Sequence, residues 1–333
     1  MGVAIRDLLA DHKTPVEWNS LGGIAAIDAH NALYQFLSII RQPDGTPLMD
    51  REGRVTSHLS GIFFRTIHFL EKGIRPVFIF DGAPPEFKAE TVRERRELRR
   101  AAGERWVQAL KEGDTEEAYR QARSSSRIDA QIIGSAKELL RLMKIPTVDA
   151  PSEGEAQAAS MARDGVVSYA ASQDYDALLF GAPVLVRNLA VSSRRKVRGR
   201  TLVVRPERII LREVLEGHSL SREDLIKIGI LIGTDFNPGI KGIGAKTALK
   251  IVRQGRFPEI ISEKSPEFDF EPVLQFFLDP PSTSSYSLQW GEPNTDEIRA
   301  LLCETYDFSE ERILSALDKI VERGGQRTLD QWF

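Results

Sequence analysis

The chain has 333 residues, a net charge of −3, 41% hydrophobic residues and 28% charged residues. These values are typical of a globular protein with enough apolar material for a large core. Cys303 is the only cysteine, which excludes an internal disulfide and a cysteine zinc site. No apolar run is long enough to span a bilayer and no signal sequence opens the chain, so we expect an intracellular, reduced protein without a membrane partner.

Apolar strands and helical patterns alternate along most of the chain. Strands are predicted at 22–28, 75–81, 145–150, 166–172, 183–188 and 200–205. Helices are predicted at 31–41, 57–72, 128–144 and directly after 153, and the charged segment 86–127 is predicted to form helices that stand away from the body. Beyond residue 207 the pattern is mostly helical. This alternation predicts an α/β protein with a central, mainly parallel, twisted sheet and helices on both of its faces.

Basic residues are unevenly distributed along the chain. Nine Arg and Lys residues and one acid lie between Arg187 and Arg212, and seven basic residues and four acids lie between Lys88 and Arg105. A surface polarised in this way favours a polyanionic partner. The stretch "RERRELRR" is explained equally well as a solvated helix face with i,i+4 pairs, whereas "SSRRKVRGR" has no such pairing.

Acidic residues follow the predicted strands and one later apolar run. They are Asp28, Asp81, Glu153, Glu155, Asp174, Asp176 and Asp235. The carboxyl ends of parallel strands share one edge of a sheet, so these side chains should converge there. Each one alone could be a turn former or a helix cap, but seven together would repel each other and raise each other's pKa.

Divalent cations would compensate this charge. Ligand sets made only of oxygen suit Mg²⁺, with Mn²⁺ as a substitute, and seven carboxylates are too many for one ion that keeps its waters. Two ions about 4 Å apart are the arrangement used for in-line phosphodiester cleavage. The sequence therefore predicts a two-metal phosphodiesterase site.

The segment "GIKGIGAKTA" (239–248) predicts a hairpin between two helices. Gly239, Gly242 and Gly244 allow a tight turn, and the N–H groups at the start of the next helix can hold a phosphate. Lys241 and Lys246 add positive charge. Alone this is an ordinary glycine-rich turn, but beside a nuclease site it predicts an anchor that follows a duplex backbone without reading sequence.

Several motifs resemble, in order and spacing, the flap endonuclease family of structure-specific 5′ nucleases. They are "DGTP", "TSHLSGIFFRT", "RPVFIFDGAPPEFK", "DAPSEGEAQAA", "SQDYDALLF" and "LIGTDFNPGIKGIGAKTAL". The resemblance extends from residue 2 to residue 333. The sequence has no Lys-rich tail, and in this respect it resembles the archaeal form of the family. The resemblance implies that the same seven carboxylates bind metal, that Lys88 and Arg95 contact the scissile phosphate, and that Tyr34 stacks on a base. It further implies DNA contacts at Gly2 and Arg41, and a K⁺ ion at the hairpin.

The resemblance implies a monomeric, Mg²⁺-dependent endonuclease with 5′–3′ exonuclease activity that removes 5′ flaps from branched DNA in replication and repair. We expect it to be cytoplasmic and nucleoid-associated, or nuclear if the source is eukaryotic. A single nuclease domain is expected over 1–322. Its parts are an N-terminal part (1–100), a helical arch (86–127), an internal part (128–255) with the hairpin element (229–253), and C-terminal helices (256–322).

Three other functions remain open from the sequence. The nearest is a sister junction or bubble endonuclease of the same superfamily. A non-catalytic junction-binding scaffold is a second, although a scaffold has no need to gather seven carboxylates. The third is a ribonuclease on a small α/β nuclease fold, for which the chain is long and the duplex anchor would lack a purpose.

The final residues, "QRTLDQWF", predict a docking tail over 323–333. Gln326, Leu329 and Trp332 are spaced three apart, so in a 3₁₀ turn they share one face, with Phe333 beside them. Terminal aromatics are good anchors for a partner's pocket. The pattern resembles the motif with which replication proteins bind the sliding clamp. The alternative is that the aromatics fold back on the protein's own core.

Overall fold

The structure, a computed structural model, describes all residues except 1, 191–193, 198–199 and 320–333. The strands of the central sheet are β1 (Thr14–Pro15), β2 (Gly23–Asp28), β3 (Ile74–Phe80), β4 (Thr147–Asp149), β5 (Tyr169–Ala171), β6 (Val184–Arg187) and β9 (Glu207–Ile210). Their order across the sheet is β1-β9-β6-β5-β2-β3-β4. Strands β6, β5, β2, β3 and β4 run parallel, β9 runs antiparallel to β6, and the edge strand β1 pairs antiparallel with β9. The prediction of a mainly parallel sheet is confirmed.

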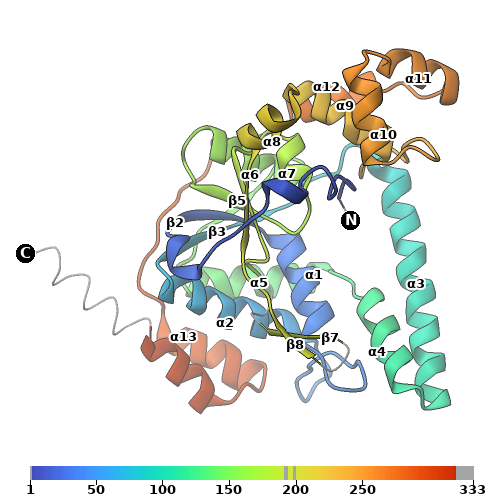
Figure 1. The fold of residues 1–333 in the computed structure, drawn as a ribbon. Coiled ribbons are helices and arrows are strands. Elements are labelled where there is room, and N and C mark those ends of the chain that lie inside the picture. Colours follow the sequence, from blue (N-terminus) through green and yellow to red (C-terminus); the bar gives the residue numbers. More distant parts are fainter. Residues whose placement is uncertain (1, 191–193, 198–199, 320–333) are drawn as a thin grey trace, which may run out of the picture.

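Helices cover both faces of this sheet, as Figure 1 shows. One face carries α1 (Ala29–Ile39), α2 (Ser57–Glu71) and α5 (Ala130–Leu142). The other carries α6 (Gly154–Arg163), α7 (Asp176–Leu179), α8 (Leu211–His218) and α9 (Arg222–Ile232). Successive strand residues point to opposite faces. In β2, Ala25 and Ile27 therefore join the core under α1, α2 and α5, whereas Ala26 joins the core under α6.

Two charged helices form the arch. After a 3₁₀ turn (Glu86–Lys88), α3 (Ala89–Glu112) and α4 (Thr115–Ser124) extend away from the sheet along one side of the molecule (Figure 1). Alanines are buried where the two helices pack, because small side chains allow close approach: Ala102, Ala109, Ala118 and Ala122. Gly113 ends α3 with a φ of 75°, in the left-handed region that favours glycine. Helix α3 stands away from the body as predicted, whereas α4 also packs against α1.

The C-terminal part is helical. Its elements are α10 (Ala245–Arg253), α11 (Phe257–Lys264), α12 (Glu271–Leu278), α13 (Thr295–Arg299) and a π-helical turn (Ala300–Thr305). Several hydrogen bonds tie the loop between α12 and α13 to the body. Gln157 of α6 exchanges two hydrogen bonds with the backbone of Thr283, and Trp290 Nε1 donates to Pro76 O at 2.9 Å. Two further 3₁₀ turns lie near the N-terminus, at Ala10–His12 and Trp18–Ser20.

The region around residues 184–210 differs from the expectation. The strand predicted at 200–205 exists as β8 (Arg200–Val203), but it pairs with β7 (Arg194–Val197) in a separate antiparallel ribbon. Strands β7 and β8 follow each other closely in the chain, and strands with so short a connection pair antiparallel. This two-stranded ribbon therefore does not extend the parallel sheet. Strands β9 and β1 were not predicted, because β9 is short and half polar and the edge strand β1 has only two residues. Among the described residues, no helix is long and apolar enough to cross a bilayer.

Candidate functional site

Six of the seven predicted carboxylates lie at the carboxyl ends of four neighbouring parallel strands. Asp28 is the last residue of β2 and Asp81 follows β3. Glu153 and Glu155 lie at the start of α6 after β4, and Asp174 and Asp176 lie at the start of α7 after β5. The seventh, Asp235, comes from the turn between α9 and α10. The parallel topology therefore brings residues from distant segments to one edge, as predicted.

Hydrogen bonds join these segments to one another. The N–H of Gly154 donates to Asp81 Oδ1 at 2.7 Å, and a Cβ at position 154 would lie 2.8 Å from that oxygen, so a larger residue would displace the Asp81 carboxylate. The N–H of Val3 donates to Asp176 Oδ1 at 2.6 Å. Because these donors come from other elements, the carboxylates are held by the fold as well as by their own strands.

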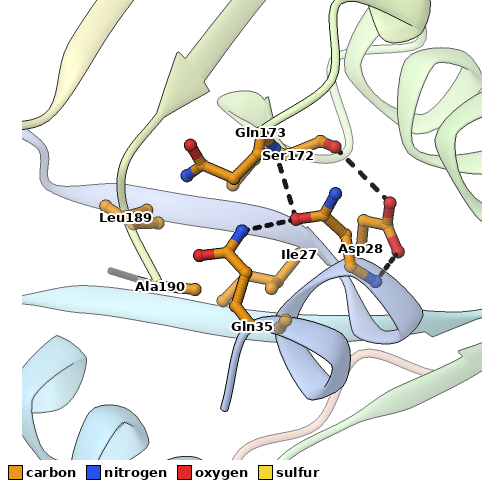
Figure 2. Close-up of a pocket in the computed structure, with 10 residues that line it drawn as sticks. Ile27, Asp28, Gln35, Ser172, Gln173, Leu189 and Ala190 are labelled. Atoms are coloured by element: carbon orange, nitrogen blue, oxygen red, sulfur yellow. Dashed lines mark hydrogen bonds between the residues drawn. The ribbon is translucent and has the colours of Figure 1, made fainter. Parts of the chain in front are cut away.

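Ser172 links three of the acidic segments. Its Oγ donates to Glu155 Oε1 at 2.6 Å, lies 3.4 Å from Asp28 Oδ2 and accepts the N–H of Asp174 at 3.2 Å. Figure 2 shows Ser172 and Asp28 beside each other on the wall of a small pocket. A hydroxyl has one proton, and the shorter distance indicates that Glu155 receives it.

Burial and mutual repulsion raise the pKa of the deepest carboxyls. Burial is the larger cause for Asp28, whose pKa is raised well above its usual value, with Asp81 adding repulsion. Burial and the charge of Asp176 raise the pKa of Glu155 in the same way. For Asp176 itself, burial and Asp235 raise the pKa to about 7. Ionising three carboxyls so close together costs free energy, and a bound cation would offset that cost.

Two cations from the base of the arch already contact this cluster. Lys88 Nζ lies 2.5 Å from Glu153 Oε2 and 3.9 Å from Asp235 Oδ2, and Arg95 forms an ion pair with Asp235. Phe87 packs on Phe236 with their ring centroids 5.6 Å apart, which brings the two segments together.

Burial opposes the charge on Lys88, but its acidic neighbours outweigh burial and raise its pKa. The pKa of Glu153 is also raised, because burial and the nearby Asp81 and Asp235 outweigh the attraction of Lys88. The pair is therefore only part of the compensation that the cluster requires.

The donor chemistry of the cluster fits hard divalent cations. Every candidate ligand is a carboxylate oxygen, and three of these carboxyls are buried against like charge. In the present side-chain arrangement, no group of three such residues within the described ranges encloses an ion position. Instead, Lys88 forms an ion pair with Glu153, and Arg95 forms one with Asp235. A metal ion bound by the full set would compete with these two cations for the carboxylate oxygens.

The other residues expected to contact DNA are placed differently. Gly2 lies against the cluster, since a Cβ there would be 2.7 Å from Asp174 Cβ. The ring of Tyr34 faces the arch, with the Arg99 guanidinium 5.4 Å from its centroid. Arg41 is not brought to the cluster. Its guanidinium donates to Leu37 O, Gly45 O and Ser126 Oγ, which ties α1 to the end of α4.

The predicted hairpin is formed by α9, a tight turn and α10. Gly239 and Gly242 have φ values of 74° and 87°, and a Cβ at Gly239 would lie 2.3 Å from Ile232 O. Gly244 caps α10 in an extended conformation, and a Cβ there would meet nothing within 4 Å. Two glycines, rather than three, are therefore needed for the turn itself. Lys241 and Lys246 are exposed beside it.

Some residues that hold the site were not among the sequence candidates. Ser172 and Asn31 contact the carboxylates directly, and Arg187 donates to Gln173 O at 2.9 Å and to the Tyr175 hydroxyl at 2.6 Å. Their only sequence signal is position, since each lies within a few residues of an acid or at a neighbouring strand end. The clamp-motif residues lie outside the described residues: Gln326, Leu329, Trp332 and Phe333.

Known proteins resemble this chain over its whole length. The XPG N-terminal domain matches residues 1–102 and the XPG I-region matches residues 144–235. A protein named Flap endonuclease 1 from Methanoculleus marisnigri is 65% identical over 333 residues, which cover 100% of both chains. The chain belongs to the flap endonuclease family. Another family member, from Pyrococcus furiosus, is 52% identical over 339 residues and covers 100% of this chain and 99% of its own length.

The fold agrees with this membership. A solved structure of flap endonuclease-1 from Methanococcus jannaschii matches with a TM-score of 0.75 and 41% identity, over 94% of this chain and 96% of that one. The resemblance inferred from the sequence motifs is confirmed, as is the α/β fold. The flap endonucleases are divalent-metal-dependent nucleases, so the carboxylate cluster belongs to a protein whose chemistry requires such ions.

Proposed function

We propose that this flap endonuclease cuts branched DNA where a 5′ single-stranded flap leaves the duplex, with 5′–3′ exonuclease activity, in replication and repair. The observation that carries the proposal is the convergence of seven carboxylates at the carboxyl edge of the parallel sheet, three of them with strongly raised pKa. The same seven would hold two Mg²⁺ ions, for which Mn²⁺ can substitute. Bound there, such ions activate a water and stabilise the attacking and leaving oxygens.

The chain's own residues perform the remaining work at the phosphate. Lys88 and Arg95, which pair with Glu153 and Asp235, lie at the junction between the arch and the carboxylates. These two cations would contact the scissile phosphate and stabilise the charge that develops on it. Their ion pairs with Glu153 and Asp235 hold them next to the carboxylates that would bind the ions.

Other parts of the fold would position the DNA. Helices α3 and α4 supply basic side chains for the single strand, and Tyr34, which faces them, would stack on a base next to the cut. Gly2 would approach the DNA beside Asp174, and Arg41 would do so only after giving up its protein acceptors. The start of α10, with Lys241, Lys246 and a K⁺ ion in the turn, would hold duplex phosphates.

The proposal also covers the extent of the domain, the C-terminal tail, the oligomeric state and the location of the protein. Residues 1–322 would form one nuclease domain, and residues 323–333 a tail that binds the sliding clamp. The enzyme would act as a monomer in the cytoplasm, associated with the nucleoid.

Cleavage of labelled DNA tests the proposed metal centre. Asp81→Ala and Asp174→Ala should nearly abolish cleavage in Mg²⁺ while DNA affinity stays close to wild type, because the proposed phosphate contacts lie elsewhere. Lys88→Ala and Arg95→Ala should slow single-turnover cleavage by about 10²-fold or more, the scale of lost transition-state electrostatics. Lys137→Ala is the matched control, since its Nζ pairs with the exposed Asp149 at 2.5 Å, outside the cluster.

The substrates separate the alternatives. Flap, nicked, bubble and four-way-junction DNA should be compared side by side, and the flap should be cut fastest. Preference for a bubble or a four-way junction would assign the chain to a sister activity. Wild-type cleavage by Asp81→Ala or Asp174→Ala would show that the two-metal assignment is wrong.

A further inference from the structure

Asn31 connects two carboxylates that come from different strands. It is the third residue of α1, directly after β2. Its backbone N–H donates to Asp28 Oδ1 at 2.9 Å, and its side-chain Nδ2 donates to Asp174 Oδ2 at 3.1 Å. One residue therefore fixes the position of one acid with its backbone and of another with its side chain.

The direction of the Asn31 amide is set by what surrounds it. A carboxylate only accepts hydrogen bonds, so the NH₂ group must face Asp174 and the oxygen must face away. On that side Asn31 Oδ1 accepts from Gln35 Nε2 at 2.7 Å and lies 3.4 Å from the N–H of Gln173. Gln35 is four residues further along α1, on the same helix face. If the amide were reversed, its oxygen would repel the carboxylate and lose both donors.

The donors to Asn31 Oδ1 lie around one small pocket. Figure 2 shows Asp28, Gln35, Ser172 and Gln173 around one pocket, joined by hydrogen bonds. Its volume is about 10 Å³, space for about one water molecule. Gln35 Oε1 is buried there and accepts no hydrogen bond within the described part of the chain. Among the described residues, the donors that orient the Asn31 amide oxygen are Gln35 Nε2 and the N–H of Gln173.

We propose that Asn31 is a positioning residue of the metal centre and that Gln35 sets its orientation. Asn31 engages one oxygen of Asp174, which turns the second oxygen and the remaining lone pairs toward the divalent ions. The proposal rests on the proposed function of Asp174 as a metal ligand. Within the described residues, the side chain of Gln35 hydrogen-bonds to Asn31 and to no carboxylate, so its effect on metal binding should pass through Asn31.

Metal binding to the full-length protein without DNA tests this arrangement. We expect Asn31→Leu to weaken Mn²⁺ binding, measured by calorimetry, by about 10- to 100-fold, the usual cost of losing a residue that orients a ligand. Its cleavage rate should recover partly at high Mn²⁺ concentration, and its unfolding temperature in EDTA should stay near that of the wild type.

Two substitutions of Gln35 isolate the orientation effect. Gln35→Met removes the donor to Asn31. Gln35→Glu also places an acceptor there, which attracts Asn31 Nδ2 and reverses the amide, so its oxygen faces Asp174. We expect Gln35→Glu to bind Mn²⁺ more weakly than Gln35→Met, although an added negative charge alone would tighten cation binding. Gln275→Met is the control, because it loses a similar i,i+4 hydrogen bond to Glu271 (2.8 Å) on an exposed helix.

The outcomes distinguish this proposal from the one on which it rests. Wild-type Mn²⁺ affinity in Asp174→Asn would overturn the proposed metal centre and the positioning role together. Weak binding in Asp174→Asn, with wild-type affinity in Asn31→Leu, would overturn only the positioning role. If Asn31→Leu does not fold, Gln35→Met and Gln35→Glu test the proposal instead. Equal Mn²⁺ affinity of these two variants, or tighter binding by Gln35→Glu, would contradict the proposal.

Discussion

His58 should lower the free energy of unfolding of the protein at acid pH. The side chain is 2% exposed in α2, and its Nε2 lies 2.8 Å from Ser135 Oγ. That hydroxyl donates to Gln131 O at 2.9 Å, so it accepts from His58 and the ring carries its proton on Nε2. Nδ1 is buried with no hydrogen-bond partner among the described residues. A second proton on Nδ1 would be buried without an acceptor, so burial lowers the pKa of His58 to about 4.

The size and sign of the effect follow from this pKa. Below pH 6.5 the unfolded chain protonates His58 while the folded protein does not, so the unfolded state gains stability until the pH falls to about 4. A fall in pKa from 6.5 to about 4 corresponds to about 3 kcal/mol, since one pKa unit is about 1.4 kcal/mol. The group contributes nothing above pH 6.5, and the loss is complete below pH 4.

The assay compares urea unfolding of wild type and His58→Leu in EDTA at pH 7.5 and pH 4. Carboxyls such as Asp176, whose pKa is raised, stabilise the folded state on protonation, but they do so in both proteins and cancel in the comparison. His58→Leu should gain about 3 kcal/mol relative to wild type on acidification. His68→Leu, on the same helix with a side chain 32% exposed, should gain much less. Parallel pH profiles of wild type and His58→Leu would refute the reasoning.

Three further predictions concern the DNA, the clamp and the metal. Gly244→Glu should weaken duplex binding and flatten its salt dependence without unfolding the protein, because a Cβ at this position meets nothing within 4 Å; an unchanged salt slope would leave the hairpin a structural turn. A peptide of residues 323–333 should bind the host's sliding clamp by calorimetry, and Trp332→Ala with Phe333→Ala should lose clamp stimulation but keep basal cleavage. Lys88→Met should bind Mn²⁺ several-fold more tightly than wild type in the absence of DNA, because a competing cation is removed, whereas Lys137→Met should not; weaker binding by Lys88→Met would indicate that the lysine supports the site.

The convergence of the acids could be predicted because parallel topology determines it. Once β2, β3, β4 and β5 are identified as buried parallel strands, the residues that follow them must share an edge. Strand identity depends on local apolar patterns, which a sequence displays directly. Strand β9 lacks such a pattern, since Glu207 and Arg208 occupy half of it, and its pairing with β6 and β1 makes it a strand. Its existence therefore depends on the folded neighbours and not on its own residues.

Side-chain contacts over long sequence separations could not be predicted. The contact between Ser172 and Glu155 depends on the spacing of β5 and α6 in three dimensions, and so does the approach of Asn31 to Asp174 across 143 residues. A serine or an asparagine near a strand end is common and usually forms a local turn or cap. The residue type therefore carries little information until the fold places a carboxylate opposite it.

Charge compensation shows why the arch and the carboxylate cluster have to be considered together. The sequence presents the basic arch and the acids as separate features, and divalent ions alone would be sufficient to balance the acids. In the structure Lys88 and Arg95 reach Glu153 and Asp235, which are 65 and 140 residues away in the chain. The phosphate that we propose these two cations contact would compete with the carboxylates for the same positive charges. The position of the base of the arch therefore depends on the charge of the cluster, because Lys88 and Arg95 belong to the arch segment and form ion pairs with the cluster.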